Sequence, residues 1–312
     1  MKQVEERYIS LLTDFGFKRI FGTAMNKDLL ICFLNSLFNG RQVVKDVSYL
    51  NPEHVGDVYT DRKAIFDVYC EGENGEKFIV EMQNAYQTYF KDRSLFYSTF
   101  PIREQAPKGS EWDFKLNHVY TVALLNFNMN EDAFDKEKIR HHVQLCDTAT
   151  HKIFYDKLEF IYVEIAKFNK MLEQLDTLYE KWLYALKNLY KLTQRPKELC
   201  DKVFDRLFEE AEIAKFTPQE MREYETSKMA YRDIKNSVDT AKREGKQEGL
   251  AEGIEIGMAK GIKEGMEKGR AEGKHEANTE TAQRLLAMGL SAEQVAKATQ
   301  LSLEIIKNLS NS

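Results

Sequence analysis

The sequence predicts an α/β domain followed by a long helical C-terminal region. Helical segments and apolar strand-like runs follow one another over residues 1–168. Beyond this point the helical pattern continues almost without interruption to residue 276. The length of 312 residues fits one ordinary domain with an appendage better than two equal domains. We therefore expect an α/β domain at 1–168, a helical extension at 169–240, and two further regions at 241–276 and 279–312.

Composition and charge exclude several classes of protein. Apolar residues make up 43% of the chain and aromatic residues 12%, which is too much for a disordered protein. No apolar run approaches the ~18 residues that a membrane helix needs, and the first residues lack a secretory signal. Four separated cysteines without a Cys-x-x-Cys pair argue against a disulfide framework and predict a cytoplasmic location. Because the net charge is −5, any contact with DNA must come from a local patch.

The first region contains the following elements. Thr13 can cap a short helix that carries Phe17 and Phe21. A second, mostly apolar helix covers residues 28–38, and Asn39-Gly40 ends it. The remaining elements are strands at 43–50, 64–70 and 77–83, a helix at 88–100 that Pro101 is expected to end, and strands at 119–125 and 160–165. This order of helices and strands is that of an α/β sandwich.

A β-hairpin is predicted over residues 66–83, because two β-rich runs flank Asn74-Gly75. Asp67 interrupts the first run and Glu81 the second, and such charges are costly unless they are paired or bound to a cation. A two-residue turn would point them to opposite faces. A three-residue loop with Gly75 in the left-handed conformation instead places Asp67 opposite Glu81, with Gln83 on the same face. We expect this loop, because one Mg²⁺ can then neutralise both carboxylates; the alternative is an ordinary hairpin with one carboxylate in solvent.

This hairpin resembles the core of the PD-(D/E)XK nucleases, with Gln83 at the usual lysine position. A wider set of motifs resembles the recombination-promoting nuclease (Rpn) and putative-transposase branch of that superfamily, from residue 8 to about 275. The motifs are Thr13-Asp14-Phe15-Gly16-Phe17-Lys18-Arg19-Ile20-Phe21-Gly22, Phe33-Leu34-Asn35, Phe66-Asp67-Val68, Val80-Glu81-Met82-Gln83, Arg93 with Tyr97, and Glu164-Ile165-Ala166-Lys167-Phe168. The resemblance implies a restriction-endonuclease-like mixed central sheet flanked by helices, DNA as substrate, and Mg²⁺ or Mn²⁺ as cofactor.

The resemblance also implies residue roles. Asp67 and Glu81 would be the catalytic metal carboxylates, with the Met82 backbone carbonyl as a third oxygen, and Gln83 would orient the attacking water. Because glutamine carries no charge and is a poor proton donor, we expect slower or more metal-dependent cleavage than at a lysine-bearing site. The expected function is a Mg²⁺-dependent DNA endonuclease acting in recombination or mobile-element biology. The alternative is an inactive protein that keeps the nuclease fold and binds DNA or assembles.

Four side chains are candidates for contacts with DNA. Arg93 and Tyr97 stand four residues apart and therefore share a helix face. Both side chains lie at the edge of the active site, or, in the alternative, Arg93 pairs with a nearby acid and Tyr97 fills the core. Lys18 and Lys63 are either phosphate contacts or solvated charges. The histidines lack the helical spacing of a zinc site, and no phosphate-binding or nucleophile-elbow motif is present.

Glycine occupies every fourth position from Gly245 to Gly273. Aliphatic residues follow several of these glycines, and the region 241–276 contains eight Lys or Arg and eight Glu residues. Each glycine costs a helix about 1 kcal/mol relative to alanine, and close approach of a second helix can offset that cost. We expect this region to self-associate into a homo-oligomer; the alternative is a semi-flexible charged tether.

The last region, 279–312, predicts a small unit of capped helices similar to a helix-turn-helix. Ser291 and Gln294 form a capping box at the start of one of these helices. The helix that would read DNA offers few groups suited to phosphates or bases. We therefore expect a packing or protein-contact role rather than DNA reading.

Overall fold

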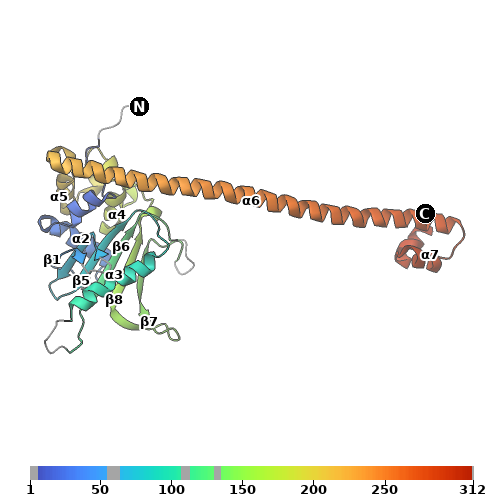
Figure 1. Cartoon of the computed structure of the whole chain (residues 1–312), viewed down its shortest axis with the longest axis horizontal. Coiled ribbons are helices and arrows are strands. Elements are labelled where there is room, and N and C mark those ends of the chain that lie inside the picture. The colour runs from blue at the N-terminus through green and yellow to red at the C-terminus, as the bar shows by residue number, and fades with distance from the viewer. Residues whose placement is uncertain (1–5, 55–63, 107–112, 130–134, 311–312) are drawn as a thin grey trace. The chain divides into compact units, whose positions relative to one another are not determined.

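The structure is a computed structural model that describes residues 6–54, 64–106, 113–129 and 135–310. The chain divides into two compact units after Val238. The helices and strands (Figure 1) are α1 (Asp14–Phe21), α2 (Lys27–Phe38), β1 (Val47–Tyr49), β2 (Glu53–His54), β3 (Ala64–Ile65), β4 (Val68–Gly72), β5 (Lys77–Gln83), α3 (Phe90–Glu104), β6 (Val119–Leu125), β7 (Arg140–Cys146), β8 (Ile153–Glu164), α4 (Leu178–Asn188), α5 (Lys202–Glu210), α6 (Pro218–Ala287), α7 (Ala292–Thr299) and α8 (Leu303–Ser310).

A six-stranded mixed sheet in the order β1-β4-β5-β6-β8-β7 forms the centre of the first unit. Strands β5, β6 and β8 are parallel, whereas β1, β4 and β7 run antiparallel to their neighbours. Parallel neighbours need a crossover connection, and α3 provides it between β5 and β6, lying across one face of the sheet (Figure 1). This is the mixed central sheet with flanking helices that the sequence predicts.

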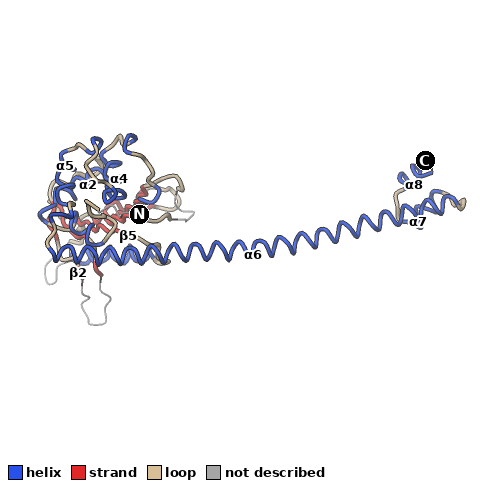
Figure 2. The backbone as a smooth tube through the Cα atoms, turned by 90° about the horizontal axis from the view of Figure 1, so that it is seen from above, coloured by secondary structure: helices blue, strands red, loops and turns tan. Residues whose placement is uncertain are grey.

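The two faces of the sheet have separate cores, because successive residues of a strand point to opposite sides. Phe78 and Val80 of β5 join the large core, to which α1, α2, α4 and α5 also contribute. Helices α2, α4 and α5 gather on one side of the strands (Figure 2). Trp182 of α4 and Phe204 of α5 are fully buried there. The residues that follow the predicted 1–168 domain therefore complete its core.

Several predicted elements are confirmed. Thr13 caps α1 through its Oγ1, which accepts a hydrogen bond from the N–H of Gly16 at 3.1 Å. Strands β5 and β6 have the expected bounds, and Asn39 ends α2 in the left-handed conformation. The run at 43–50 yields only the short β1, and the run at 64–70 is interrupted between β3 and β4.

The predicted end of α3 at Pro101 is wrong. The helix continues to Glu104, with Pro101 inside it. Proline removes one backbone hydrogen bond from a helix. In α3, however, Phe90, Ser94, Ser98 and Pro101 form one buried face. Packing of this face offsets the lost hydrogen bond.

Gly16 is required by a close backbone approach at the start of α1. A Cβ atom at this position would lie 2.1 Å from the carbonyl oxygen of Ser10. We expect Gly16→Ala to lower the free energy of unfolding by about 1–3 kcal/mol, measured by urea unfolding followed by circular dichroism. The control is Gly245→Ala in α6, where an added Cβ meets nothing within 4 Å; it should stabilise its helix by about 0.5–1 kcal/mol. This account would be contradicted if both variants had the same midpoint of urea unfolding as the wild-type protein.

The second unit contains residues 239–287 of α6 together with α7 and α8. Its small core consists of Ala282, Val295, Leu301 and Ile306, with Leu285, Leu286, Leu290 and Ile305 packed against it. The capping box at Ser291 and Gln294 is confirmed. The first helix of the unit predicted at 279–312 is the end of α6, which runs to Ala287, and Gly289 then has a φ of +86°. Across the described ranges, none of the helices has the length and apolar character needed to cross a bilayer.

Candidate active site

The hairpin of β4 and β5 has the three-residue loop that the sequence predicts. Gly75 has a φ of +80°, the left-handed conformation expected for it. The N–H of Gly72 donates to the carbonyl of Glu76, so residues 73–75 form the loop. The paired residues are Val68 with Val80, Tyr69 with Ile79, Cys70 with Phe78, and Glu71 with Lys77. One further step in this register brings Asp67 opposite Glu81.

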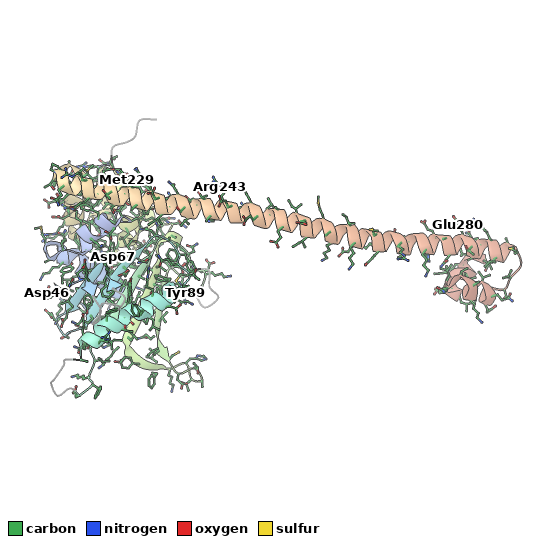
Figure 3. The ribbon with its side chains drawn as sticks, in the orientation of Figure 1. Asp46, Asp67, Tyr89, Met229, Arg243 and Glu280 are labelled. Atoms are coloured by element: carbon green, nitrogen blue, oxygen red, sulfur yellow. The ribbon has the colours of Figure 1, made fainter. Side chains whose placement is uncertain are left out.

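Asp67 and Glu81 converge at the end of the hairpin. The N–H of Met82 donates to Oδ2 of Asp67 at 2.8 Å, and the N–H of Asp67 donates to Oε1 of Glu81 at 3.3 Å. Each carboxylate is therefore held by a backbone group on the opposite strand. Glu81 is 7% exposed, and Figure 3 shows Asp67 at the end of the sheet. The register and these hydrogen bonds bring the two acids to one place.

The electrostatics of this pair favour a bound cation. Burial, together with the neighbouring charge of Asp67, raises the pKa of Glu81 to about 8. Burial also raises the pKa of Asp67, against the opposing effects of the Met82 N–H and the charge of Lys18. Two buried carboxylates that disfavour each other's ionisation are stabilised by a divalent ion.

Gln83 connects this pair to Arg93. The Gln83 Nε2 donates to Oε2 of Glu81 at 3.0 Å, and the Nη2 of Arg93 donates to Oε1 of Gln83 at 2.5 Å. Because a guanidinium only donates hydrogen bonds, it fixes the orientation of the amide. The Nη1 of Arg93 also donates to Oε1 of Gln87 at 2.5 Å. Arg93 thus holds two glutamine side chains and reaches the acid pair through Gln83.

Tyr97 and Lys18 lie on helices of different layers. The guanidinium carbon of Arg93 lies 5.8 Å from the centre of the Tyr97 ring, which packs edge-on against Phe66. Lys18 of α1 places its Nζ 2.7 Å from Oδ1 of Asp14 and 4.0 Å from Oδ1 of Asp67. The structure therefore brings Lys18 and Arg93 to the acid pair, whereas Lys63 lies outside the described residues.

Two asparagines near this site were not predicted. The Nδ2 of Asn84 donates to the carbonyl of Leu12 at 2.7 Å. The Nδ2 of Asn126 lies 3.3 Å from Oδ1 of Asn84 and 3.3 Å from the hydroxyl of Tyr231. Asn84 directly follows β5 and Asn126 directly follows β6. Because these strands are parallel, their ends meet at one edge of the sheet, and this position in the sequence was the available signal.

The donor set of the acid pair fits a hard divalent cation. Mg²⁺ prefers one or two carboxylates and keeps several of its water ligands. In the described part of the chain, no group of three or more His, Cys, Asp or Glu residues is arranged to hold a metal. The histidines lie against single glutamates instead. Nε2 of His141 lies 2.8 Å from Oε1 of Glu164, and Nδ1 of His142 lies 3.0 Å from Oε1 of Glu159. Asp67 and Glu81 are two converging carboxylates that could hold Mg²⁺ together with water ligands.

Comparison with known proteins agrees with this geometry. The profile described as PD-(D/E)XK nuclease family transposase matches residues 11–241. The searches of curated proteins and of solved structures gave no match. The matched span contains the whole central sheet and every described residue of the acid site. The resemblance carried by the sequence motifs is confirmed, and the chain belongs to the PD-(D/E)XK nuclease family transposases.

Proposed function

We propose that this protein is a metal-dependent DNA endonuclease that hydrolyses phosphodiester bonds. The observation that carries the proposal is the convergence of Asp67 and Glu81, two buried carboxylates held by hydrogen bonds across their hairpin. Two cationic side chains, Lys18 and Arg93, lie beside the pair. Membership of a nuclease and transposase family supports DNA as the substrate and a role in recombination or in the movement of DNA elements.

In this proposal Asp67 and Glu81 hold Mg²⁺ or Mn²⁺, and the Met82 carbonyl adds a third oxygen. When bound, the ion supplies the chemistry that polarises a phosphate and lowers the pKa of an attacking water. Gln83 positions Glu81, and its second amide hydrogen is available to orient that water. Lys18 and Arg93 contribute positive charge for the phosphate, and Tyr97 shapes the site beside Arg93. Lys63 stays a proposed contact with the DNA backbone.

The proposal is tested by incubating purified full-length protein with supercoiled plasmid DNA. We expect nicking in the presence of Mg²⁺ or Mn²⁺ and complete loss of nicking when EDTA removes the metal. Heat-inactivated protein in the same buffer is the control for contaminating nuclease. Plasmid that stays supercoiled with either metal would contradict the proposal.

A second candidate function is a catalytically inactive protein that keeps the nuclease fold to bind DNA or to assemble. It is favoured by Gln83, which stands at the lysine position and whose amide oxygen already accepts a hydrogen bond from Arg93. In the plasmid experiment this candidate predicts retarded migration of the DNA without nicking.

We also propose that residues 241–276 of α6 associate with a second copy of the chain. An added Cβ at any glycine from Gly245 to Gly273 meets nothing within 4 Å. Leu250, Ile254 and Met266 are each more than half exposed. A second helix that approaches the glycines closely would bury this aliphatic stripe. The equal numbers of positive and negative side chains leave no net charge among them to oppose association.

This association is tested by light scattering of the full chain and of a variant lacking residues 241–276. We expect the full chain to have a mass that is a multiple of the monomer mass and the variant to have a lower multiple. Replacing Gly253, Gly257 and Gly261 by leucine should lower the mass in the same way, because leucine keeps the helix but prevents close approach. Replacing the neighbouring Glu255 by alanine is the control. An unchanged number of chains per particle after the deletion would contradict the proposal.

A further inference from the structure

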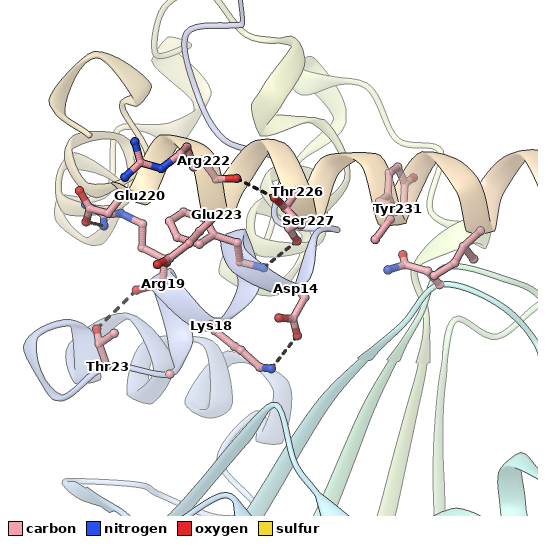
Figure 4. Close-up of a pocket in the computed structure, with 15 residues that line it drawn as sticks. Asp14, Lys18, Arg19, Thr23, Glu220, Arg222, Glu223, Thr226, Ser227 and Tyr231 are labelled. Atoms are coloured by element: carbon pink, nitrogen blue, oxygen red, sulfur yellow. Dashed lines mark hydrogen bonds and ion pairs between the residues drawn. The ribbon is translucent and has the colours of Figure 1, made fainter. Parts of the chain in front are cut away.

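A cavity of about 860 Å³ lies between α1 and the first turns of α6. Figure 4 shows Asp14 and Lys18 on α1, paired with each other, and Ser227 and Tyr231 on α6. The N–H of Phe15 donates to Oγ of Ser227 at 3.0 Å, which joins the two helices at this point. A cavity of this volume is in the range of small-molecule binding sites, ~300–1,000 Å³.

The cavity adjoins the acid pair. Lys18 lines it, and the Nζ of Lys18 lies 4.0 Å from Oδ1 of Asp67. Asn84 also lines it and directly follows Gln83 at the end of β5. A phosphate held at Asp67 and Glu81 would therefore lie beside the cavity. The nucleotide next to that phosphate could then reach into it.

The walls of the cavity suit a neutral aromatic group better than a second phosphate. Its three basic side chains are balanced by three acidic ones; these are Lys18, Arg19, Arg222, Asp14, Glu220 and Glu223. Within this set the Nζ of Lys18 pairs with Asp14 at 2.7 Å, and the Nη1 of Arg19 pairs with Glu220 at 2.5 Å. The aromatic residues Phe15 and Tyr231 also line the cavity. A phosphate needs a surplus of donors and positive charge, whereas a base needs apolar and aromatic surface.

Aromatic side chains are also exposed between β5 and α3. Tyr86 is 48% exposed and Tyr89 is 73% exposed. Tyr89 immediately precedes α3, one helical turn before Arg93. Proteins that bind single-stranded DNA use exposed aromatic rings, on which unpaired bases stack, beside cationic groups that hold the backbone. These residues therefore point to the same kind of substrate as the cavity does.

We propose that the cavity between α1 and α6 accepts an unpaired nucleobase next to the scissile phosphate, so that the substrate is single-stranded or locally unpaired DNA. This inference rests on the proposed endonuclease function. A base in a duplex must leave its stack and its partner before it can enter such a cavity, and that step costs least where the DNA is already unpaired.

The test compares three fluorescein-labelled oligodeoxynucleotide substrates, a single strand, a full duplex and a duplex with an internal unpaired bubble. Cleavage is measured with Mg²⁺, and binding is measured by fluorescence anisotropy with Ca²⁺ in its place. Ala230→Trp fills the cavity from α6, and Ile234→Trp fills it from the next turn. Met229→Trp is the matched control, because Met229 lies on the same helix, is 60% exposed and does not line the cavity.

We expect the wild-type protein to bind and cleave the single strand and the bubble about tenfold better than the duplex. Ala230→Trp and Ile234→Trp should lose this preference, whereas Met229→Trp should keep it. Equal cleavage of all three substrates by the wild type would overturn the inference. An unchanged preference in both filled variants would also overturn it, provided that both variants have the wild-type melting temperature. Absence of all cleavage together with a cavity-dependent preference in binding would overturn the endonuclease proposal and support the cavity.

Discussion

Replacing Asp67 by asparagine is expected to lower Mg²⁺-dependent cleavage of DNA by about 100-fold or more. Asparagine keeps the size of the side chain but removes the charge that we propose holds the cation. Stabilisation of the transition state by such a cation is worth several kcal/mol. The hydrogen bond from the Met82 N–H to Oδ2 of Asp67 can still form with an amide oxygen. The variant should therefore fold, and the loss should appear in the rate constant of plasmid nicking.

Glu81→Gln is expected to give a loss of the same size, because both carboxylates are proposed to hold the same ion. The matched control is Glu71→Gln on β4, whose carboxylate pairs with Lys77 at 2.7 Å on the same hairpin. The control should nick plasmid at the wild-type rate. Wild-type nicking by both Asp67→Asn and Glu81→Gln would show that the active site is elsewhere in the protein.

The free energy of unfolding of the metal-free protein is expected to fall as the pH rises from about 5 to about 8. In the folded protein the pKa of Glu81 is raised to about 8 from its ordinary value of 4.5. Between these pH values the folded state keeps a proton that the unfolded state has lost, so each rise in pH favours unfolding. The slope for one such group is at most about 1.4 kcal/mol per pH unit. The raised pKa of Asp67 acts in the same direction.

Addition of Mg²⁺ should reverse much of this loss at pH 8 and have little effect at pH 5, because the ion binds the ionised carboxylates. The measurement is the melting temperature by scanning calorimetry at several pH values, with Mg²⁺ and with EDTA. Glu81→Gln should flatten the pH dependence and remove most of the response to Mg²⁺. A metal-free melting temperature that stays constant from pH 5 to pH 8 would contradict the assignment of Glu81 as a buried carboxyl with a raised pKa.

The local geometry of the hairpin could be predicted from the sequence. Asn74-Gly75 between two β-rich runs left a two-residue turn and a three-residue loop open, and the gain from neutralising both carboxylates with one cation favoured the three-residue loop. Because side chains alternate along a strand, the loop length alone decides whether Asp67 and Glu81 meet. The Thr13 cap and the bounds of β5 and β6 were predictable for similar reasons, since each depends on residues a few positions apart.

Contacts between distant segments could not be predicted in this way. Pro101 is tolerated inside α3 because one face of that helix is buried by packing. The local sequence pattern does not reveal this packing. The segment at 169–240 has a helical pattern, but only packing shows that Trp182 and Phe204 complete the core of the sheet domain. Propensity is a weak guide wherever tertiary contacts are strong.

The sequence by itself determined the hairpin, its pair of acids and the family motifs, because these depend on backbone geometry over short spans. Only the tertiary structure decided which positively charged side chains lie near the two acids. It brings Lys18 from α1 to Asp67 and Arg93 from α3 to Gln83, which in turn contacts Glu81. It also places α6 across from α1 and so forms the cavity beside Lys18. The physical reason is that such neighbours are set by how the layers pack around the core, and sequence spacing does not encode the distance between segments that lie far apart along the chain.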